Sequence, residues 1–229
     1  MKHTLRLAVL AACLPAAACA ARGGTHAAGG EAPPHEHAPA TPDSPSPAHA
    51  PAHAHGTMLP ATPGPGYTVA DVRFMQGMIG HHAQAIAMAK MAPTHGAGER
   101  VSQLAQKIDI SQRDEIGFME RWLADRGQAV PDDEQRHAMQ MPGMLTPEQM
   151  AQLDAARGRE FDRLFLTFMI QHHRGALDMV AALFDDPLAA QDPDIFRFVT
   201  DVDADQRAEI YVMQSMLGML ATTGGSGSR

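Results

Sequence analysis

The chain has 229 residues, 45% of them hydrophobic and 19% charged, and its formal net charge is −8. This length accommodates one or two domains, and the acidic balance argues against nucleic acid as a partner, because phosphate binding requires clustered basic charge. Both cysteines, Cys13 and Cys19, lie near the N-terminus. The rest of the chain therefore has no thiol for a disulfide, a thiolate metal site or cysteine catalysis.

The first 20 residues have the form of an export signal. Lys2 and Arg6 precede an apolar run that is too short to span a bilayer and ends in small residues. Cleavage after Ala20 is one alternative, and lipid attachment at Cys19 is the other. We prefer Cys19 to Cys13 for the lipid, because Cys13 leaves a very short apolar region. We expect an exported protein of the periplasm or cell envelope, with a lipid anchor as its route of membrane attachment.

Residues 21–66 consist almost wholly of Ala, Pro, Gly, His, Ser and Thr. So few apolar side chains cannot form a core, so this composition predicts a disordered linker. His-rich tracts of this kind are typical of metal binding. The auxiliary metal ligands that we infer in this tract are His35, His37, His49, His53 and His55.

The remaining chain is predicted to form four long helices. Thr68 and Asp71 make a capping box at the start of the first helix, and Asp192 with Pro193 supplies the N-cap and first position of the last. A second capping box at Thr146 begins a short helix in the connection. The long helices cover about residues 69–93, 98–126, 159–184 and 193–223. The corresponding divisions are a first half at 67–127, a connection at 128–157, a second half at 158–221 and a disordered tail at 222–229.

The two halves repeat one sequence pattern. Residues 78–88 read MIGHHAQAIAM, and residues 169–179 read MIQHHRGALDM. Each is followed by a second match, at 111–123 and 205–217, that shares Gln-Arg-x-Glu-Ile-x-x-Met. Each half is therefore the same pair of helices. Short loops within each pair imply two antiparallel hairpins that pack as an all-α four-helix bundle.

Polar side chains are directed inward from all four helices. At about 100° per residue, His82 lies at the centre of the apolar stripe, whereas His81 lies at its edge, beside Met88. The second half repeats this arrangement with His173 central and His172 at the edge. A buried polar group left unpaired costs roughly 1–3 kcal/mol, so these groups require partners or a ligand. The inward polar residues of the partner helices are Gln112, Glu115, Gln206 and Glu209.

The combination of ligand types selects the metal. Thioether with imidazole, and no thiolate, suits soft Cu(I), with Ag(I) as its mimic, whereas imidazole alone would admit Cu(II), Zn or Ni. Methionine is abundant, with 16 residues, and recurs in HAMQMPGM at 137–144. Met88 is seven residues from His81, about 10 Å along the helix axis. Several ions, or ligands shared between helices, are therefore required.

Three other interpretations compete with copper binding. A non-metal interaction module of the cell envelope would use the core His, Gln and Glu only to specify the bundle, with methionine as core filler. A ferritin-like di-iron site would use Glu-x-x-His one turn apart, and the four predicted helices contain none. An enzyme is not predicted, because the sequence has no Gly-x-Ser-x-Gly and no Gly-rich phosphate loop.

The segments FMQGMIGHHAQAIAMA and FDRLFLTFMIQHHRGALDMV, with the Gln-x-x-Glu-Ile-x-x-Met that follows each, resemble domain-of-unknown-function family 305. The linking MPGMLTPEQM is also similar to that family. The resemblance implies a ferritin-like four-helix fold and an exported protein, often a lipoprotein, and some relatives are linked to periplasmic copper binding and copper tolerance. The motif positions that it implies as metal ligands are Met78, His81, His82, Met88, Met169, His172, His173 and Met179.

The sequence therefore predicts an extracytoplasmic protein that sequesters or hands on copper, and it names no protein partner. We expect His81 and His172 to be mainly ligands, because an edge position leaves an ion a way in. We expect His82 and His173 to be partly structural, bonded to the inward Gln and Glu residues, which would support the ligands.

Overall fold

The computed structural model describes residues 59–224 as helices joined by loops. Within this range the only extended pairing is one isolated bridge between Gly64 and Tyr67. The all-α bundle predicted from the sequence is confirmed. The long helices are α1 (Val69–Ala89), α2 (Glu99–Asp125), α5 (Gly158–Phe184) and α6 (Pro193–Gly224), and the connection carries α3 (Asp133–Ala138) and α4 (Pro147–Ala155).

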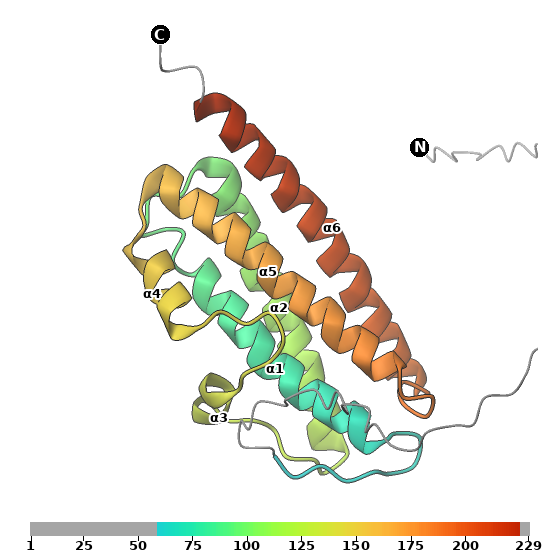
Figure 1. The fold of residues 1–229 in the computed structure, drawn as a ribbon. Coiled ribbons are helices and arrows are strands. Elements are labelled where there is room, and N and C mark those ends of the chain that lie inside the picture. Colours follow the sequence, from blue (N-terminus) through green and yellow to red (C-terminus); the bar gives the residue numbers. More distant parts are fainter. Residues whose placement is uncertain (1–58, 225–229) are drawn as a thin grey trace, which may run out of the picture. The chain divides into compact units, whose positions relative to one another are not determined.

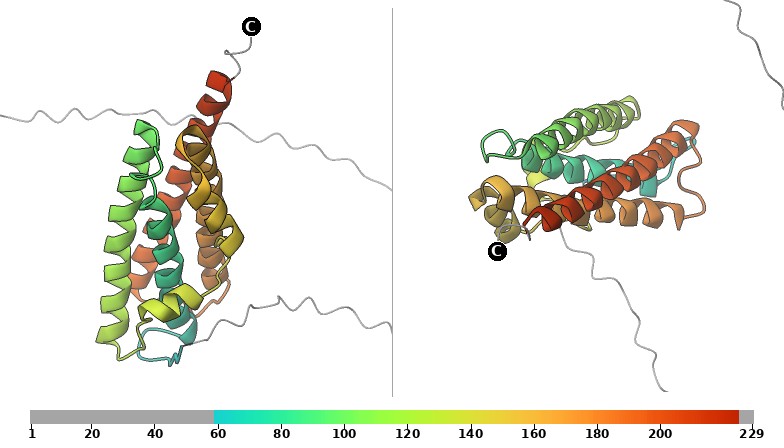
Figure 2. Two further views of the ribbon diagram at one scale, coloured as in Figure 1. Left: turned by 90° about the vertical axis from the view of Figure 1, so that its left-hand side faces the viewer. Right: turned by 90° about the horizontal axis from the view of Figure 1, so that it is seen from above.

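The long helices form two hairpins that pack face to face. α1 pairs with α2, α5 pairs with α6, and α1 packs against α5 (Figure 1). Between α2 and α6, the rings of Phe118 and Phe198 stack with centroids 4.6 Å apart. The two short helices lie on one side of the bundle, where α3 contacts α1 and α4 contacts α5 (Figure 2).

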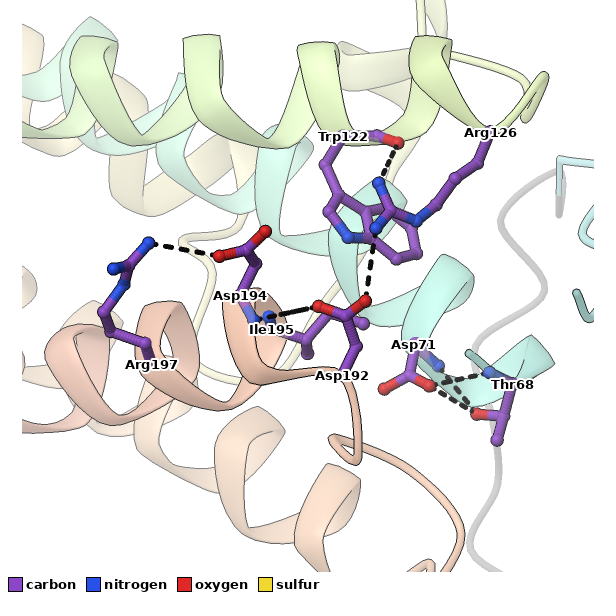
Figure 3. A network of polar contacts seen from close by, with 8 residues as sticks. All are labelled: Thr68, Asp71, Trp122, Arg126, Asp192, Asp194, Ile195 and Arg197. Atoms are coloured by element: carbon purple, nitrogen blue, oxygen red, sulfur yellow. Dashed lines mark hydrogen bonds and ion pairs between the residues drawn. The ribbon is translucent and has the colours of Figure 1, made fainter. Parts of the chain in front are cut away.

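Side-chain caps begin the helices where the sequence predicts them. Thr68 and Thr146 each form a capping box, and Asp192 Oδ1 accepts from the backbone N–H groups of Asp194 and Ile195 (Figure 3). One short helix, α3, was not predicted. Its N-cap Asp132 also forms a capping box. The capping box alone did not predict a helix, because the six residues that follow show no apolar stripe.

Two buried aspartates tie each hairpin to the turn of the other. Asp71 accepts from Thr68 within the capping box, and its second oxygen accepts from the N–H of Ala190 at 2.7 Å. Asp162, at the matching place in the second half, accepts from the N–H of Gly98 at 3.0 Å. These bonds fix the turn of one hairpin against the start of the other, so both carboxylates have structural partners.

Arg126 joins the ends of α2 and α6. Its guanidinium lies over the rings of Trp122 and Tyr67, 4.2 and 5.6 Å from their centroids. It also donates to the carbonyl of Trp122 and pairs with Asp192 at 3.3 Å (Figure 3). A cation between two aromatic faces and a carboxylate stabilises this end of the bundle.

Residues 59–66, which the composition assigns to the linker, contact the bundle. The N–H of Thr62 donates to Gln128 at 3.1 Å, and the side chain of Gln76 donates to the carbonyl of Pro60 at 3.0 Å. The boundary predicted at residue 66 therefore lies too late. Composition does not reveal this, because polar contacts and one small apolar side chain, Ala61, join the segment to the bundle.

At the other end, α6 continues to Gly224 and so includes the first residues of the predicted tail. The predicted export signal, Cys19 and the His-rich tract all lie outside the described residues. No described helix is long and apolar enough to cross a membrane.

Replacing Asp71 with Ala should lower the free energy of unfolding by about 2–3 kcal/mol, because the half-buried N–H of Thr68 and the buried N–H of Ala190 lose their acceptor. Asp178, exposed on α5, provides the control. Asp178→Ala should change stability by less than about 0.5 kcal/mol. Urea denaturation of both variants measures the difference, and equal losses would contradict the structural role of Asp71.

Candidate metal site

The polar side chains of the long helices form one layer across the middle of the bundle. Buried apolar residues fall into two clusters, and on every long helix the polar positions lie between members of one cluster and members of the other. All members of the polar layer are buried except Glu115, which is half-buried. The layer consists of His81, His82, Gln112, Glu115, His172, His173, Gln206 and Glu209.

Two histidines pair with glutamates in the same way in both halves. His82 Nε2 lies 2.5 Å from an oxygen of Glu115, and His173 Nε2 lies 2.8 Å from an oxygen of Glu209. The expectation that these central histidines bond an inward Gln or Glu therefore resolves in favour of Glu. The second pair differs from the first, because Lys107 approaches Glu209 at 3.6 Å.

The other two histidines meet at the crossing of α1 and α5. The ring centroids of His81 and His172 are 3.8 Å apart. His81 Nε2 donates to the carbonyl of Pro142 at 3.1 Å, and His172 Nε2 donates to the carbonyl of His81 at 3.0 Å. Both side chains are fully buried. The prediction that His81 and His172 lie at an open edge is therefore wrong, because the facing helix and the connection cover this flank of the apolar stripe.

The partners of the four imidazoles fix their tautomers. Every Nε2 faces a carbonyl or carboxylate oxygen, and such oxygens only accept, so the ring proton resides on Nε2. Each Nδ1 then carries a free lone pair. Among the described residues, all four Nδ1 atoms are buried without a hydrogen-bond partner. A histidine that donates one nitrogen to an oxygen and leaves the other free has the arrangement of a metal ligand.

Burial keeps the rings of His81 and His172 neutral. Loss of hydration, and next the neighbouring His82, lower the pKa of His81 to about 3. Loss of hydration, and next His81, also lower the pKa of His172 well below its ordinary value. Metal binding requires the neutral imidazole, so no proton has to leave these rings at neutral pH before an ion binds.

The motif methionines flank the polar layer on both sides. Met78 and Met179 belong to one apolar cluster, and Met88 and Met169 belong to the other. Each His-His motif thus sends its two thioethers to opposite sides, as the helical rise requires, and each side receives one thioether from each half. Sharing of ligands between helices, expected from the spacing, is compatible with this arrangement.

Carboxylates do not complete a site of their own. Among residues 59–224, no group of three or more His, Cys, Asp or Glu side chains is arranged to hold one ion. Glu115 and Glu209 bond separate histidines, and Asp71 and Asp162 accept from backbone N–H groups. A di-iron site therefore lacks its bridging carboxylates, and a site in this layer would need thioether ligands.

The inward glutamines differ from their predicted role. Both amide atoms of Gln112, and the amide oxygen of Gln206, are buried without a hydrogen-bond partner among the described residues. They lie in the layer but do not bond the histidines. Sequence reasoning also missed Pro142, whose carbonyl orients His81. Its only signal was the Met-Pro-Gly-Met segment, which has no periodicity to place it.

Residues 71–217 match the profile of DUF305, a domain of unknown function. The chain belongs to the DUF305 family. A putative secreted DUF305 protein from Streptomyces coelicolor is 26% identical, with a TM-score of 0.59, over 66% of this chain and 94% of that one. A DUF305 fragment from Deinococcus radiodurans is 31% identical, with a TM-score of 0.58, over 67% and 98%.

A further structural relative of this DUF305 chain is CopM in its Cu(I)-bound form. It is 29% identical, with a TM-score of 0.52, over 64% of this chain and 94% of CopM. CopM is also similar in Cu(II)-bound and Ag-bound forms. An uncharacterized protein of Acanthamoeba polyphaga mimivirus is 40% identical over 58 residues, a match that spans 25% of this chain and only 38% of that protein.

Acid should destabilise the metal-free protein through His81. Its pKa lies below the ordinary value of 6.5, so the unfolded chain binds the proton more readily than the folded one. The contribution of neutral His81 to the free energy of unfolding is complete above pH 6.5 and is lost as the pH falls toward 3. Between pH 6.5 and 5 the free energy of unfolding should fall by about 2 kcal/mol through this residue.

His81→Gln should make the stability of the metal-free protein less dependent on pH over this interval, because the amide still donates to Pro142 but does not titrate. Chemical denaturation in the presence of a chelator, at pH 7 and pH 5, compares the variant with the wild type. Equal losses of stability in the two proteins would contradict the assignment to His81.

Proposed function

We propose that this protein binds Cu(I) in its polar layer and sequesters the ion or hands it on outside the cytoplasm. The observation that carries the proposal is the set of four buried imidazole Nδ1 atoms, each free while its Nε2 bonds an oxygen. Thioethers lie on both sides of these rings. This ligand chemistry suits Cu(I), with Ag(I) as its mimic.

The family comparisons support the same assignment. CopM has been crystallised with Cu(I), Cu(II) and Ag, and the Streptomyces coelicolor relative is described as a putative secreted protein. For this chain we infer export by residues 1–20, with Cys19 as the site of a lipid anchor, and an auxiliary role for the His-rich tract. We infer no catalytic activity.

The ligand assignment divides into imidazoles of the layer and thioethers of the flanking clusters. His81, His82, His172 and His173 would contribute Nδ1, since Nε2 is engaged. Met78 with Met179, and Met88 with Met169, would contribute sulfur from either side. The bound ion would supply no chemistry beyond its own storage or transfer, and the chain's part is to exclude water and to hold each ring in one tautomer.

Elemental analysis of protein purified from the cell envelope should find copper, and the double variants His81→Ala/His172→Ala and His82→Ala/His173→Ala should each lose at least about tenfold in Cu(I) affinity. His95 is buried outside the layer, where it bonds the Asp154 carbonyl. His95→Ala is therefore the control for removal of a buried imidazole. Competition with a chromophoric Cu(I) chelator gives the affinities, and unchanged binding in both double variants would contradict the proposed site.

The carboxylates should tune the imidazoles that they hold. In Glu115→Gln/Glu209→Gln each amide still occupies the same volume, but it is a weaker acceptor for Nε2–H, so the ring becomes less basic. Cu(I) affinity should fall about 10- to 100-fold. Glu160→Gln, which removes an exposed charge paired with Arg163, should leave affinity within about twofold.

A non-metal interaction module is the second candidate. It is favoured by the His–Glu bonds, which pair these polar groups without any ion. Under this function, replacing His82 and Glu115 together with Leu should be tolerated, because apolar replacement of both partners leaves nothing unpaired. A melting temperature that does not change when Cu(I) is added, together with tolerance of that double variant, would favour this candidate over copper binding.

A further inference from the structure

A methionine-rich segment of the connection lies across α1. We call residues Met139–Met144 the methionine strap; it follows α3 and crosses the face of the bundle in Figure 1. Met141 covers Gly77, with its methyl carbon 2.6 Å and its sulfur 3.5 Å from the point where a Cβ would lie. Met139 covers Gly80, one turn further on, with its sulfur 2.5 Å from the corresponding point.

A third thioether reaches the same place from the other hairpin. The methyl carbon of Met179, on α5, lies 3.4 Å from the point where a Cβ of Gly77 would be. Met179 and Met141 therefore share the space above one glycine. Gly77 and Gly80 are neighbours on the helix surface, with about 5–6 Å between such positions. Three sulfur-bearing side chains, two from the strap and one from α5, thus gather on one face of α1.

Hydrogen bonds hold the strap to both hairpins. The carbonyl of Pro142 accepts from His81, and the carbonyl of Gly143 accepts from Gln171 at 3.3 Å. Gly175 leaves room for the strap backbone, because a Cβ there would lie 1.9 Å from the Pro142 carbonyl oxygen. The thioethers are therefore attached to an anchored backbone.

The internal duplication is broken where the strap lies. Gly77 and Gly80 correspond to Phe168 and Gln171 in the second half. A phenylalanine or glutamine on α1 would occupy the space that Met141 and Met139 now fill. The first half therefore has glycines where the second has large side chains, and the vacated surface is covered by sulfur rather than by an aliphatic residue.

We propose that Met139, Met141 and Met179 form a thioether site for a soft monovalent ion, Cu(I) or Ag(I), beside the polar layer. This rests on the proposed function in taking the same ion and in using Met179, but the two strap methionines are further ligands and the site contains no imidazole. Thioethers are soft and neutral, so the site selects Cu(I) and Ag(I) against Zn(II) and Cu(II). The three rotatable bonds of each methionine allow the sulfurs to turn toward one ion.

If these methionines only filled space, leucine would serve equally well, whereas an ion requires their sulfur. Replacement by leucine therefore tests the proposal. In Met139→Leu/Met141→Leu the strap keeps its apolar volume but loses two sulfurs. Met75→Leu/Met213→Leu is the matched control, because both methionines are fully buried and neither belongs to the strap. Native mass spectrometry counts the Ag(I) ions bound by each full-length protein.

The strap variant should bind one Ag(I) fewer than the wild type, whereas the control should bind the same number and the uptake of Cu(II) should not change. An unchanged Ag(I) count in the strap variant would overturn the proposal. If the double variant fails to fold by circular dichroism, Met141→Leu alone is counted instead, with the same expected loss.

Ion binding by the polar layer is measured separately. His81→Ala/His172→Ala should keep the Ag(I) ion of the strap while it loses ions of the layer. Retention of every ion in that histidine variant, with loss in the strap variant, would support the strap site and contradict the proposed function of the layer. Loss in the histidine variant only would do the reverse.

Discussion

The buried polar layer is the constraint on which the rest of the bundle depends. Four imidazoles, two amides and two carboxylates lie between two apolar clusters, where each unpaired polar group costs about 1–3 kcal/mol. The helices and the connection give each imidazole and each carboxylate one partner. α2 must place Glu115 against His82, α6 must place Glu209 against His173, and α1 must cross α5 where His172 reaches a backbone carbonyl. A shift by one turn would break these pairs, so the layer selects one packing from the many that apolar helices allow.

The two halves share this layer but differ around it. Lys107 accompanies Glu209, whereas the matching residue on α6 is Asp201, so Glu115 lacks the same counterion. The connection adds the larger difference, because it occurs once in the chain and has no counterpart in the other half. Gln171 of the second half holds the backbone of the methionine strap, while the matching Gly80 makes room for its thioether. The duplication thus supplies the scaffold, and the single connection makes the two faces of that scaffold chemically different.

Periodicity and capping residues predicted the four long helices, because each signal is local. Thr68 and Asp192 cap the helices at the positions that the sequence predicts. The inward direction of His82 and His173 also follows from one helix considered alone. The burial of His81 does not, because a single stripe cannot reveal which neighbour covers its edge. Contacts of irregular backbone are beyond periodicity altogether, and for that reason the carbonyl of Pro142 and the thioethers of the strap could not be placed from the sequence.

Charge gives the layer a further reason to accept a cation. The Nδ1 atoms of His82 and His173 have no hydrogen-bond partner among the described residues, and each ring bonds a carboxylate through Nε2. Burial, and next the negative charges of Glu115 and Glu209, raise the pKa of Asp205, which shows that the carboxylates act on one another across the α2–α6 seam. Lys107 pairs with one of them and is itself mostly exposed. A monovalent cation held by the free Nδ1 atoms would offset this excess of negative charge and would satisfy the nitrogens that the protein leaves without partners.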